Sequence, residues 1–367
     1  MRTLRAFLSL CLLSVTLAGG ASAQQSQRPR PQVPMDSARA RQLYVSNRHA
    51  DHPPANYAEH MAEKARTDSI FAARAAGVLD YRKVRYRSSV GDLDIPAYVF
   101  GPLQPRGAKG HPAIIMVHGG VHGNMTPTYW PYFRDAVERG YVIVAPDYRG
   151  STGYGAEFHN AIDYGGYEVD DAMSAYDYIV QHLPHVDPAR VGMMGWSHGG
   201  YITLLSLFRD EHPFRAGAAI VPVTNLIFRL SYKGPGYQRS FATQARLGGL
   251  PFEKREEYIA RSPYYHVDKL EVPLLVHVAT NDEDVDFEEA EPLIYKLQAL
   301  KPGLAETKIY VDPTPWGSSV GHAFSRRVDP ETLEPQWSPE MRDSWTRTWA
   351  FFAEHLRPWQ TAPATQQ

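Results

Sequence analysis

Ser197, in the run G-W-S-H-G-G at positions 195–200, is the first candidate for chemistry in this chain. The run joins the apolar residues VGMM to the apolar residues YITLLSL, so a buried strand would lead through a tight turn into a helix. A G-x-S-x-G turn between a strand and a helix is typical of a nucleophile elbow, which exposes the serine hydroxyl at a sheet edge. We therefore predict that Ser197 is a nucleophile; the alternative is a serine in a structural bend.

The partners of such a serine can be sought by chain order. A serine hydroxyl needs a base to remove its proton, and on elbow-bearing sheets an acid and then a histidine follow the serine. Asp282, three positions after the last residue of the apolar run PLLVHVA, is the carboxylate nearest to a strand end and is the predicted acid. Three further carboxylates in its loop compete with it: Glu283, Asp284 and Asp286. Only His322 and His355 come later, and His355 lies on a closing helical segment, so His322 is the predicted base.

Two backbone N–H groups are predicted to stabilise an oxyanion. The first belongs to His198, whose side chain should point away from Ser197 on the elbow. The second belongs to the loop VHGGVHGN at 117–124, whose glycines let the backbone approach a substrate oxygen. We assign this second donor to Gly120, with Val121 as the alternative.

For other residues near these loops, the sequence gives weaker evidence of a metal site or a substrate pocket. His118 and His122 have the spacing of a metal-binding pair, but they lie on a glycine loop with no glutamate between them, so no metal or other cofactor is predicted. Three aromatic residues are candidates for a substrate pocket: Trp196, Tyr232 and Trp316. A core aromatic is an equal alternative for Trp316, which stands in the loop before the predicted base.

The elements that must position these residues alternate along the chain from about residue 81. A hairpin is predicted over 82–90 and 94–100, followed by strands at 113–120, 141–150, 190–195, 216–223, 273–279 and 307–312. Helices are predicted at 127–139, 168–183, 201–210, 289–300 and 338–356. Near-continuous apolar strands that alternate with helices predict an α/β fold, with a mostly parallel central sheet covered on both faces. The candidate loops follow strands at the edge where such sheets bind ligands.

The N-terminus has the features of a secretory signal peptide: Arg2 and Arg5, an apolar run, and the small residues Ala21-Ser22-Ala23. A membrane anchor is the alternative, but the apolar run is short for a span. The expected organisation is a signal at 1–23, a flexible leader at 24–55, a helical segment at 56–80, a catalytic domain at 81–358 and a frayed tail at 359–367. Residues 224–265 form a small lid or a plain insertion. We expect an exported protein, periplasmic or extracellular.

Composition narrows the function classes. The 367 residues are 43% hydrophobic and 21% charged, as in ordinary globular proteins. A formal charge of −2 without a basic run argues against a nucleic-acid partner. Cys11, the only cysteine, lies in the predicted signal, which excludes cysteine nucleophiles and cysteine zinc sites from the mature chain. Nothing after the signal reads as a membrane span, and the oligomeric state is left open.

Five stretches together resemble the catalytic domain of the prolyl oligopeptidase family, and most of all its acylaminoacyl-peptidase branch. They are GWSHGG, HGGVHG, PDYRGSTGYGAEFHNAIDYGGYEVDD (146–171), SPYYHVDKLEVPLLVHVATNDEDV (262–285) and GHAF (321–324). The similarity covers roughly residues 82–357. It implies an α/β-hydrolase fold with Ser197, Asp282 and His322 as a triad and two backbone amides as oxyanion donors. Family peptidases usually carry an N-terminal β-propeller, for which residues 24–81 are too few and too helical.

The resemblance implies an exported serine hydrolase that acts through an acyl-enzyme, most simply a serine peptidase cleaving short peptides. The departure from the propeller pattern favours the alternative, a carboxylesterase acting on small acyl or aryl esters, because the same triad serves both reactions. A non-catalytic binding protein on the same fold is a remote third possibility. It is disfavoured because serine, acid and histidine all remain in the required order.

Overall fold

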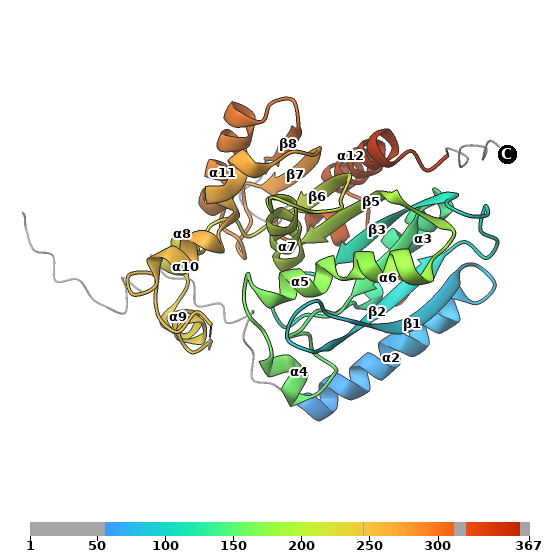
Figure 1. Ribbon diagram of the computed structural model, residues 1–367, viewed down its shortest axis with the longest axis horizontal. Helices are drawn as coiled ribbons and strands as arrows, with labels where there is room; N and C mark the ends of the chain where they lie inside the picture. The colour runs from blue at the N-terminus through green and yellow to red at the C-terminus, as the bar shows by residue number, and fades with distance from the viewer. Residues whose placement is uncertain (1–55, 245, 312–320, 360–367) are drawn as a thin grey trace, which may run out of the picture.

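The computed structural model describes residues 56–244, 246–311 and 321–359, which form one mixed sheet with helices on both sides (Figure 1). The strand order is β1-β2-β4-β3-β5-β6-β7-β8. The strands are β1 Asp80–Arg87, β2 Asp94–Gly101, β3 His111–Val117, β4 Val142–Pro146, β5 Val186–Trp196, β6 Ala216–Ile220, β7 Leu274–Ala279 and β8 Ala305–Tyr310. β1–β2 and β2–β4 pair antiparallel, and all other pairs are parallel. The predicted α/β class is confirmed.

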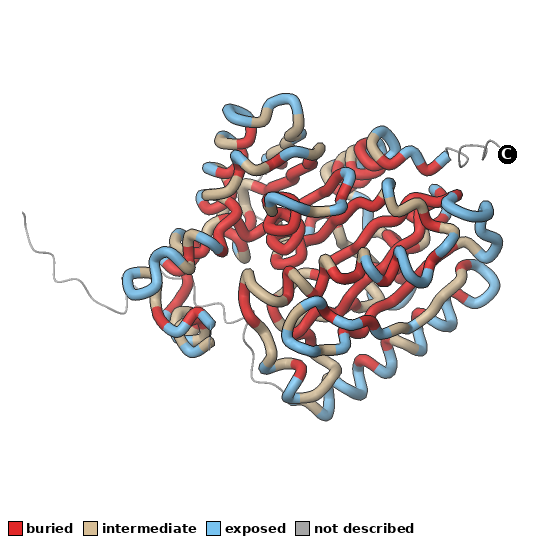
Figure 2. The backbone as a smooth tube through the Cα atoms, viewed as in Figure 1, coloured by how far each residue is buried: buried red, intermediate tan, exposed pale blue. Residues whose placement is uncertain are grey.

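The two faces of the sheet are covered by different helices, and the side chains of β3 alternate between them. Ile114 and Met116 pack on one face, and Ile115 and Val117 pack on the other. The first face is covered by α2 Tyr57–Ala75, α3 Trp130–Glu138 and α12 Pro339–Leu356. The second is covered by α5 Tyr167–Met173, α6 Ala175–His182, α7 His198–Leu207 and α11 Phe287–Leu300. The buried chain in Figure 2 follows the strands, as this layering requires.

The helix predicted over 168–183 is two helices in the structure, because the chain breaks at Ser174 between α5 and α6. The Ser174 hydroxyl donates to the Asp170 carbonyl at 2.7 Å and accepts from the Ser89 N–H at 2.9 Å. The break therefore lies where the β1–β2 hairpin attaches to this layer. A serine can make such local hydrogen bonds in place of a regular helical turn.

Helix α2 lies along the antiparallel end of the sheet (Figure 1). Its buried side chains are Lys64, Thr67, Phe71 and Ala75, which recur at the three- and four-residue spacing of one helix face. Phe71 packs edge-on against Tyr98 and Phe100 of β2. One member of this buried face is a lysine, which the sequence pattern did not single out.

Residues 224–265 contain α8 Leu226–Tyr232, α9 Pro235–Ala242 and α10 Arg255–Ala260, which project beyond the carboxyl ends of the parallel strands (Figure 1). The short helices η1 Pro127–Tyr129, α4 Ala156–Asn160, η2 Pro263–Lys269 and η3 Phe324–Arg326 complete the described elements. We call residues 224–265 the insertion; its role as a lid stays a prediction.

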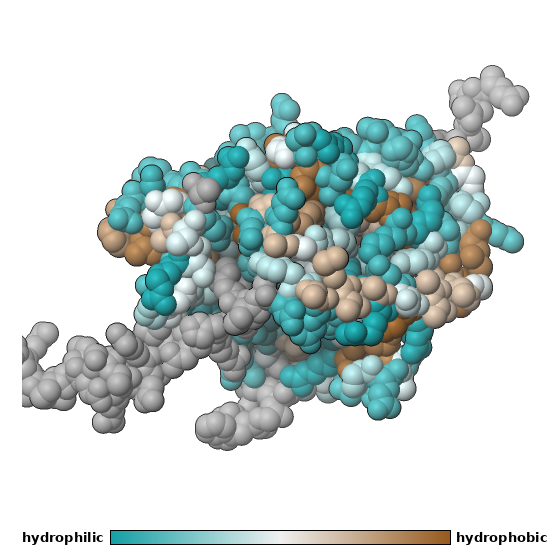
Figure 3. Space-filling model, turned by 90° about the horizontal axis from the view of Figure 1, so that it is seen from below, coloured by the Kyte–Doolittle hydropathy of each residue, from teal (hydrophilic) through white to brown (hydrophobic). Residues whose placement is uncertain are grey.

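The predicted signal peptide, leader and most of the tail lie outside the described residues. None of the described helices is long and apolar enough to cross a membrane. Seen from below in Figure 3, hydrophilic side chains cover most of the surface, and hydrophobic ones gather in small separate areas.

Candidate active site

Ser197 stands alone between the end of β5 at Trp196 and the start of α7 at His198. Its backbone angles are φ 54° and ψ −118°, in a region that a residue with a side chain rarely occupies. The neighbouring strand holds this conformation, because the Ser197 N–H donates to the Ile220 carbonyl of β6 at 2.9 Å. Ser197 is partly exposed while both of its neighbours are buried. The turn therefore presents one side chain, that of the serine.

Two glycines permit this turn by the absence of a side chain. A Cβ on Gly199 would overlap the Val117 carbonyl of β3, and a Cβ on Gly195 would overlap the backbone of Gly199. The strand, the turn and the first turn of α7 are thus packed backbone against backbone. This is the crowded strand–turn–helix arrangement that the sequence predicted around Ser197.

Asp282 and His322 meet in a direct contact. The His322 Nδ1 lies 2.8 Å from Oδ2 of Asp282 and 2.9 Å from Oδ1, so the ring donates its Nδ1–H to the carboxylate. Asp282 Oδ1 also accepts from the N–H groups of Asp284 and Val285, both at 2.9 Å. The carboxylate is therefore fixed from two sides and nearly buried, with 3% of its side chain exposed. An imidazole that donates from Nδ1 keeps Nε2 to accept a proton.

Other residues that competed for these roles are placed differently. Glu283, Asp284 and Asp286 lie in the same loop as Asp282, but none of them has a described contact with His322. His355 packs on Phe351 of its own helix α12, with ring centroids 4.7 Å apart. Ser197 follows β5, which lies two strands along the sheet from β7, and the loop after β7 carries Asp282. The described contacts include no hydrogen bond between Ser197 and His322; in apo structures such bonds are often long.

The loop of residues 118–125, which we call the glycine loop, packs directly on the serine turn. A Cβ on Gly119 would lie 3.2 Å from the Ser197 Cβ and 2.9 Å from the Trp196 carbonyl. The Gly119 N–H donates to the Tyr129 hydroxyl at 2.9 Å and is thereby occupied. The N–H groups of Gly120 and Val121 remain the candidate donors in this loop.

The Gly120 and Val121 N–H groups share their peptide groups with the carbonyls of Gly119 and Gly120, and both carbonyls accept hydrogen bonds. His118 Nδ1 lies 3.0 Å from the Gly119 carbonyl, and the Tyr148 hydroxyl donates to the Gly120 carbonyl at 2.6 Å. In a trans peptide the N–H points opposite to the carbonyl, so each contact also sets the direction of the next N–H. The geometry fixes both peptides and leaves the choice between Gly120 and Val121 open.

The His198 side chain lies in a buried pocket of its own. Its Nε2 is 3.3 Å from Oε1 of Glu168, and its ring packs edge-on against Tyr164 with centroids 4.5 Å apart. The backbone N–H groups of Gly165 and Gly166 both donate to the Glu168 carboxyl. Burial raises the pKa of Glu168 to about 8. Sequence reasoning missed Glu168, because a glutamate on an amphipathic helix is normally on its solvated side.

Replacing Glu168 by glutamine should change how stability depends on pH. With its pKa raised from 4.5 to about 8, folded Glu168 keeps a proton that the unfolded chain releases between these values. Its contribution is therefore present below pH 4.5 and is lost as the pH rises through 8. Glu168→Gln cannot lose a proton, so its Tm relative to wild type should rise steadily from pH 5 to pH 8.5. A Tm difference that does not vary with pH would contradict this assignment.

A buried ion pair supports the far end of the glycine loop. Asp147, fully buried after β4, lies 2.5 Å from Lys64 Nζ of α2 and accepts the Met125 N–H at 2.6 Å. Lys64 Nζ also donates to the Met125 carbonyl at 2.9 Å. Burial lowers the pKa of Lys64, and the carboxylate of Asp147 opposes that change. Helix α2 is therefore connected to the glycine loop through a buried charged side chain.

The two histidines of the glycine loop make internal contacts. His118 Nε2 is 2.9 Å from the Ser151 hydroxyl, and burial lowers its pKa to about 4. His122 Nδ1 is 2.7 Å from the Gly150 carbonyl, and its ring stacks on His159 with centroids 3.8 Å apart. Across the described ranges, no cluster of three or more acidic, histidine or cysteine side chains is placed to hold a metal ion.

One of the three predicted pocket residues, Trp196, needs correction. Trp196 does not line a pocket, because its side chain is fully buried behind the serine turn. Its indole N–H donates to the Ser325 hydroxyl at 3.0 Å, and its ring packs edge-on against Tyr132. The strand alternation explains this: the residue before the elbow points into the core when the serine points out of the sheet edge. Trp316 lies outside the described residues.

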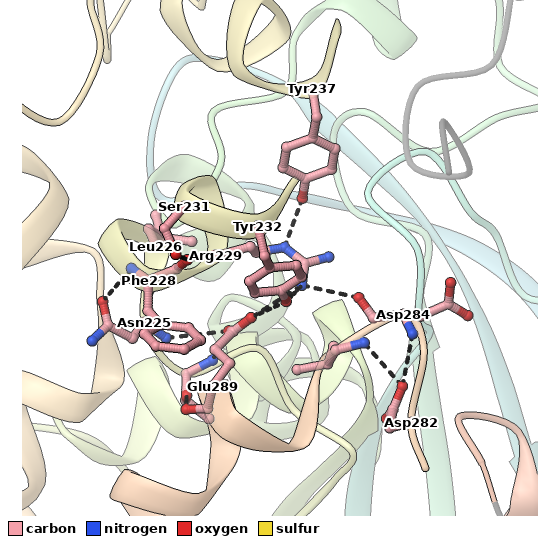
Figure 4. Close-up of polar contacts among 12 residues, drawn as sticks. Asn225, Leu226, Phe228, Arg229, Ser231, Tyr232, Tyr237, Asp282, Asp284 and Glu289 are labelled. Carbon is pink, nitrogen blue, oxygen red and sulfur yellow. Dashed lines mark hydrogen bonds and ion pairs between the residues drawn. The ribbon is translucent and has the colours of Figure 1, made fainter. Parts of the chain in front are cut away.

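Tyr232, the third pocket candidate, belongs to a polar network that joins the insertion to the loop carrying Asp282 (Figure 4). Its hydroxyl donates to the Glu289 carboxylate and accepts from Arg229 Nη1 at 3.0 Å. Arg229, buried on α8, also donates to the Tyr237 hydroxyl at 2.8 Å and to the Asp284 carbonyl at 3.2 Å. The insertion is thus attached to the loop that carries Asp282. A role for Tyr232 in a substrate pocket stays a prediction.

Two solved structures with a similar fold are peptidases. An acylaminoacyl peptidase from Pyrococcus horikoshii superposes with a TM-score of 0.62 and 20% identity, over 82% of this chain and 45% of that one. A puromycin-hydrolyzing peptidase from Mycobacterium tuberculosis gives a TM-score of 0.59 and 24% identity, over 75% and 39%. At these identities the likeness shows the α/β-hydrolase fold alone.

Sequence comparison extends the likeness to a family. The uncharacterized peptidase YuxL of Bacillus subtilis is 33% identical over 250 residues, which are 68% of this chain and 36% of that protein. The chain spans about a third of the length of the curated relatives it matches, since dipeptidyl aminopeptidase BIII of Pseudoxanthomonas mexicana is covered over 28% of its length. The profile described as Prolyl oligopeptidase family matches residues 131–327, which is more than half of the sequence. On this match, together with the serine turn and the sheet that bears it, the chain belongs to the prolyl oligopeptidase family.

Proposed function

We propose that the protein is an exported serine peptidase that cleaves short peptides through an acyl-enzyme. In this scheme Ser197 Oγ attacks the carbonyl carbon of the scissile bond while His322 Nε2 takes the hydroxyl proton. Asp282 holds the imidazole by the Nδ1 contact and stabilises its protonated form. His322 then gives the proton to the leaving amine, and water releases the acyl group by the reverse sequence.

The negative charge that develops on the carbonyl oxygen needs donors that are already in place. The N–H of His198, at the first position of α7, is the first donor. The second is Gly120, with Val121 as the alternative, on peptides that His118 and Tyr148 already orient. Donors fixed before the reaction stabilise the transition state without reorganising.

The single observation that carries this proposal is the His322–Asp282 contact, at the sheet edge where the strained Ser197 turn also lies. A peptide substrate is supported by the peptidases named among the relatives. Export to the periplasm or the medium rests on the first 23 residues of the sequence. A carboxylesterase acting on small acyl or aryl esters is the second candidate, since the same three residues serve both reactions.

A comparison of anilide and ester substrates separates these candidates. The purified mature protein should hydrolyse aminoacyl and short peptidyl p-nitroanilides with measurable kcat, because His322 can protonate an amine leaving group. The matched p-nitrophenyl esters serve as the reference reaction, and Ser197→Ala is the background control for both. Rapid ester turnover with negligible anilide turnover would instead identify a carboxylesterase. A folded protein that no fluorophosphonate probe labels would point to the non-catalytic alternative.

A further inference from the structure

A cavity of about 610 Å³ lies beside the glycine loop, and the proposed mechanism does not use it. Its wall combines His122 from the glycine loop with Asp163 and Tyr167 from the chain around α4 and α5, and with Gln244 and Arg246 from the insertion. His122 comes three residues after Gly119, which packs on the serine turn. The glycine loop therefore forms part of the wall of this cavity as well as part of the surroundings of Ser197.

Two charged groups of the wall, Arg149 and Asp163, already have ion-pair partners. Arg149 donates Nε and Nη2 to the Asp171 carboxylate at 2.7 Å and 2.6 Å. Asp163 accepts Arg261 Nη1 at 2.7 Å on one oxygen and the Tyr167 N–H at 3.1 Å on the other. Both partners, Asp171 and Arg261, lie outside the cavity lining. Arg261 is shared between two carboxylates, because its Nε also donates to Glu257 at 2.6 Å.

Arg246 is a half-exposed cation of the cavity wall. It lies 3.6 Å from Asp163, which is closer to Arg261 at 2.7 Å. The Arg246 guanidinium carbon lies 3.6 Å from the centre of the Tyr167 ring, so the aromatic face orients a side chain that is 50% exposed. Its charge is thus held in place and still open to a ligand.

Further N–H donors accompany this charge. Gln244 accepts the Tyr164 N–H on Oε1 at 3.0 Å, which fixes its amide and leaves Nε2 to donate. Arg149 Nη1 makes no hydrogen bond with any described residue, and its guanidinium carbon lies 4.9 Å from the same Tyr167 ring. A wall with a half-exposed guanidinium and additional N–H donors matches a carboxylate, which is an acceptor only.

We propose that this cavity is a subsite for a carboxylate of the peptide substrate, with Arg246 as the residue that determines specificity. The carboxylate is either an acidic side chain or the carboxyl terminus of the peptide. This inference rests on the proposed peptidase function, because it names the substrate class of the same site. Tyr167 orients Arg246, and Gln244 contributes a neutral donor.

Equilibrium binding to the Ser197→Ala protein tests the subsite without requiring turnover. The probes are amide-capped hexapeptides of alanine and serine that carry one Glu, or the matching Gln, at each position in turn. A second pair is the all-neutral hexapeptide with a free or an amidated carboxyl end. One charged probe should bind about tenfold more tightly than its neutral partner in calorimetric titration, which is the effect of one charge-assisted hydrogen bond. Which probe shows this preference distinguishes an acidic side chain from the carboxyl terminus of the peptide.

Two variants in the Ser197→Ala background decide the role of Arg246. Arg246→Ala should abolish the preference for the charged probe while neutral probes bind as before. Arg239→Ala is the matched control, because Arg239 is an exposed arginine of α9 that does not line the cavity, and it should keep the preference. Equal binding of charged and neutral probes at every position would overturn the proposal, as would a preference that survives Arg246→Ala. A preference for carboxylates in a protein that hydrolyses neither anilides nor esters would overturn the proposed function and leave the subsite standing.

Discussion

Alanine in place of Ser197 is expected to lower kcat on the order of 10⁶-fold and to abolish labelling by a fluorophosphonate probe. Without the hydroxyl no acyl-enzyme forms, while binding and the oxyanion donors keep a small residual rate. The elbow remains intact, because its contacts with Ile220 and Val117 are made by backbone atoms. Steady-state hydrolysis of p-nitrophenyl esters measures the loss, and circular dichroism verifies the fold.

Substitution of His322 or Asp282 should also lower kcat, and the losses should not add up, because the three residues act as one unit. His322→Ala should cost as much as Ser197→Ala, and Asp282→Asn on the order of 10⁴-fold, because the imidazole then loses its carboxylate partner. The Ser197→Ala/His322→Ala pair should be no slower than either single variant. His355→Ala on α12 is the control and should keep wild-type kcat. Full activity in His322→Ala would remove this histidine from the mechanism.

Methionine in place of Lys64 is expected to lower the free energy of unfolding by about 3–5 kcal/mol. The lysine is 2% exposed and Asp147 fully buried, so the variant leaves a carboxylate in the interior without its cation. The Met125 carbonyl also loses its donor, and the glycine loop loses its attachment to α2. Chemical denaturation monitored by tryptophan fluorescence measures the change. The rate at which a fluorophosphonate probe labels Ser197 should also be lower in this variant than in wild type, at temperatures where the variant is folded.

A second ion pair to the same helix provides the control. Lys83 of β1 meets Asp68 of α2 at 2.5 Å, with 33% and 29% of their side chains exposed. Lys83→Met should therefore cost only about 0–1 kcal/mol. The double variant Lys64→Met/Asp147→Asn should recover part of the lost stability, since the uncompensated charge is gone. If Lys64→Met is no more destabilising than Lys83→Met, the buried pair does not have the supporting role given to it here.

The parts of this molecule that follow from local pattern could be predicted from the sequence. Apolar runs and their lengths were enough for the strand–helix alternation, and the position of a loop after a strand was enough to choose Asp282 among four carboxylates. In the structure, Asp282 is the carboxylate that contacts His322. Both inferences depend on order along the chain and on which edge of a sheet a loop must occupy.

The parts that depend on charges inside the protein could not be predicted in this way. Lys64 and Glu168 each stand on a helix whose pattern would be equally satisfied by a solvated side chain, and both are buried. Their partners, Asp147 and His198, lie far away in sequence, so no spacing rule connects them. The prediction that Trp196 lines a pocket was wrong for a related reason. A residue next to the serine in sequence can place its ring on either side of the strand.

The serine turn has a consequence for when the protein becomes active during folding. The unusual backbone of Ser197 exists only because β6 accepts its N–H and because β3, some eighty residues earlier, leaves room for Gly199. Contacts so distant in sequence form only once the chain has assembled its central strands. A newly made or partly unfolded chain therefore holds an ordinary serine, unreactive toward peptides. In the proposed mechanism, nucleophilicity at this position is therefore a property of the completed sheet, and a serine peptidase built this way cannot attack its surroundings before it has folded.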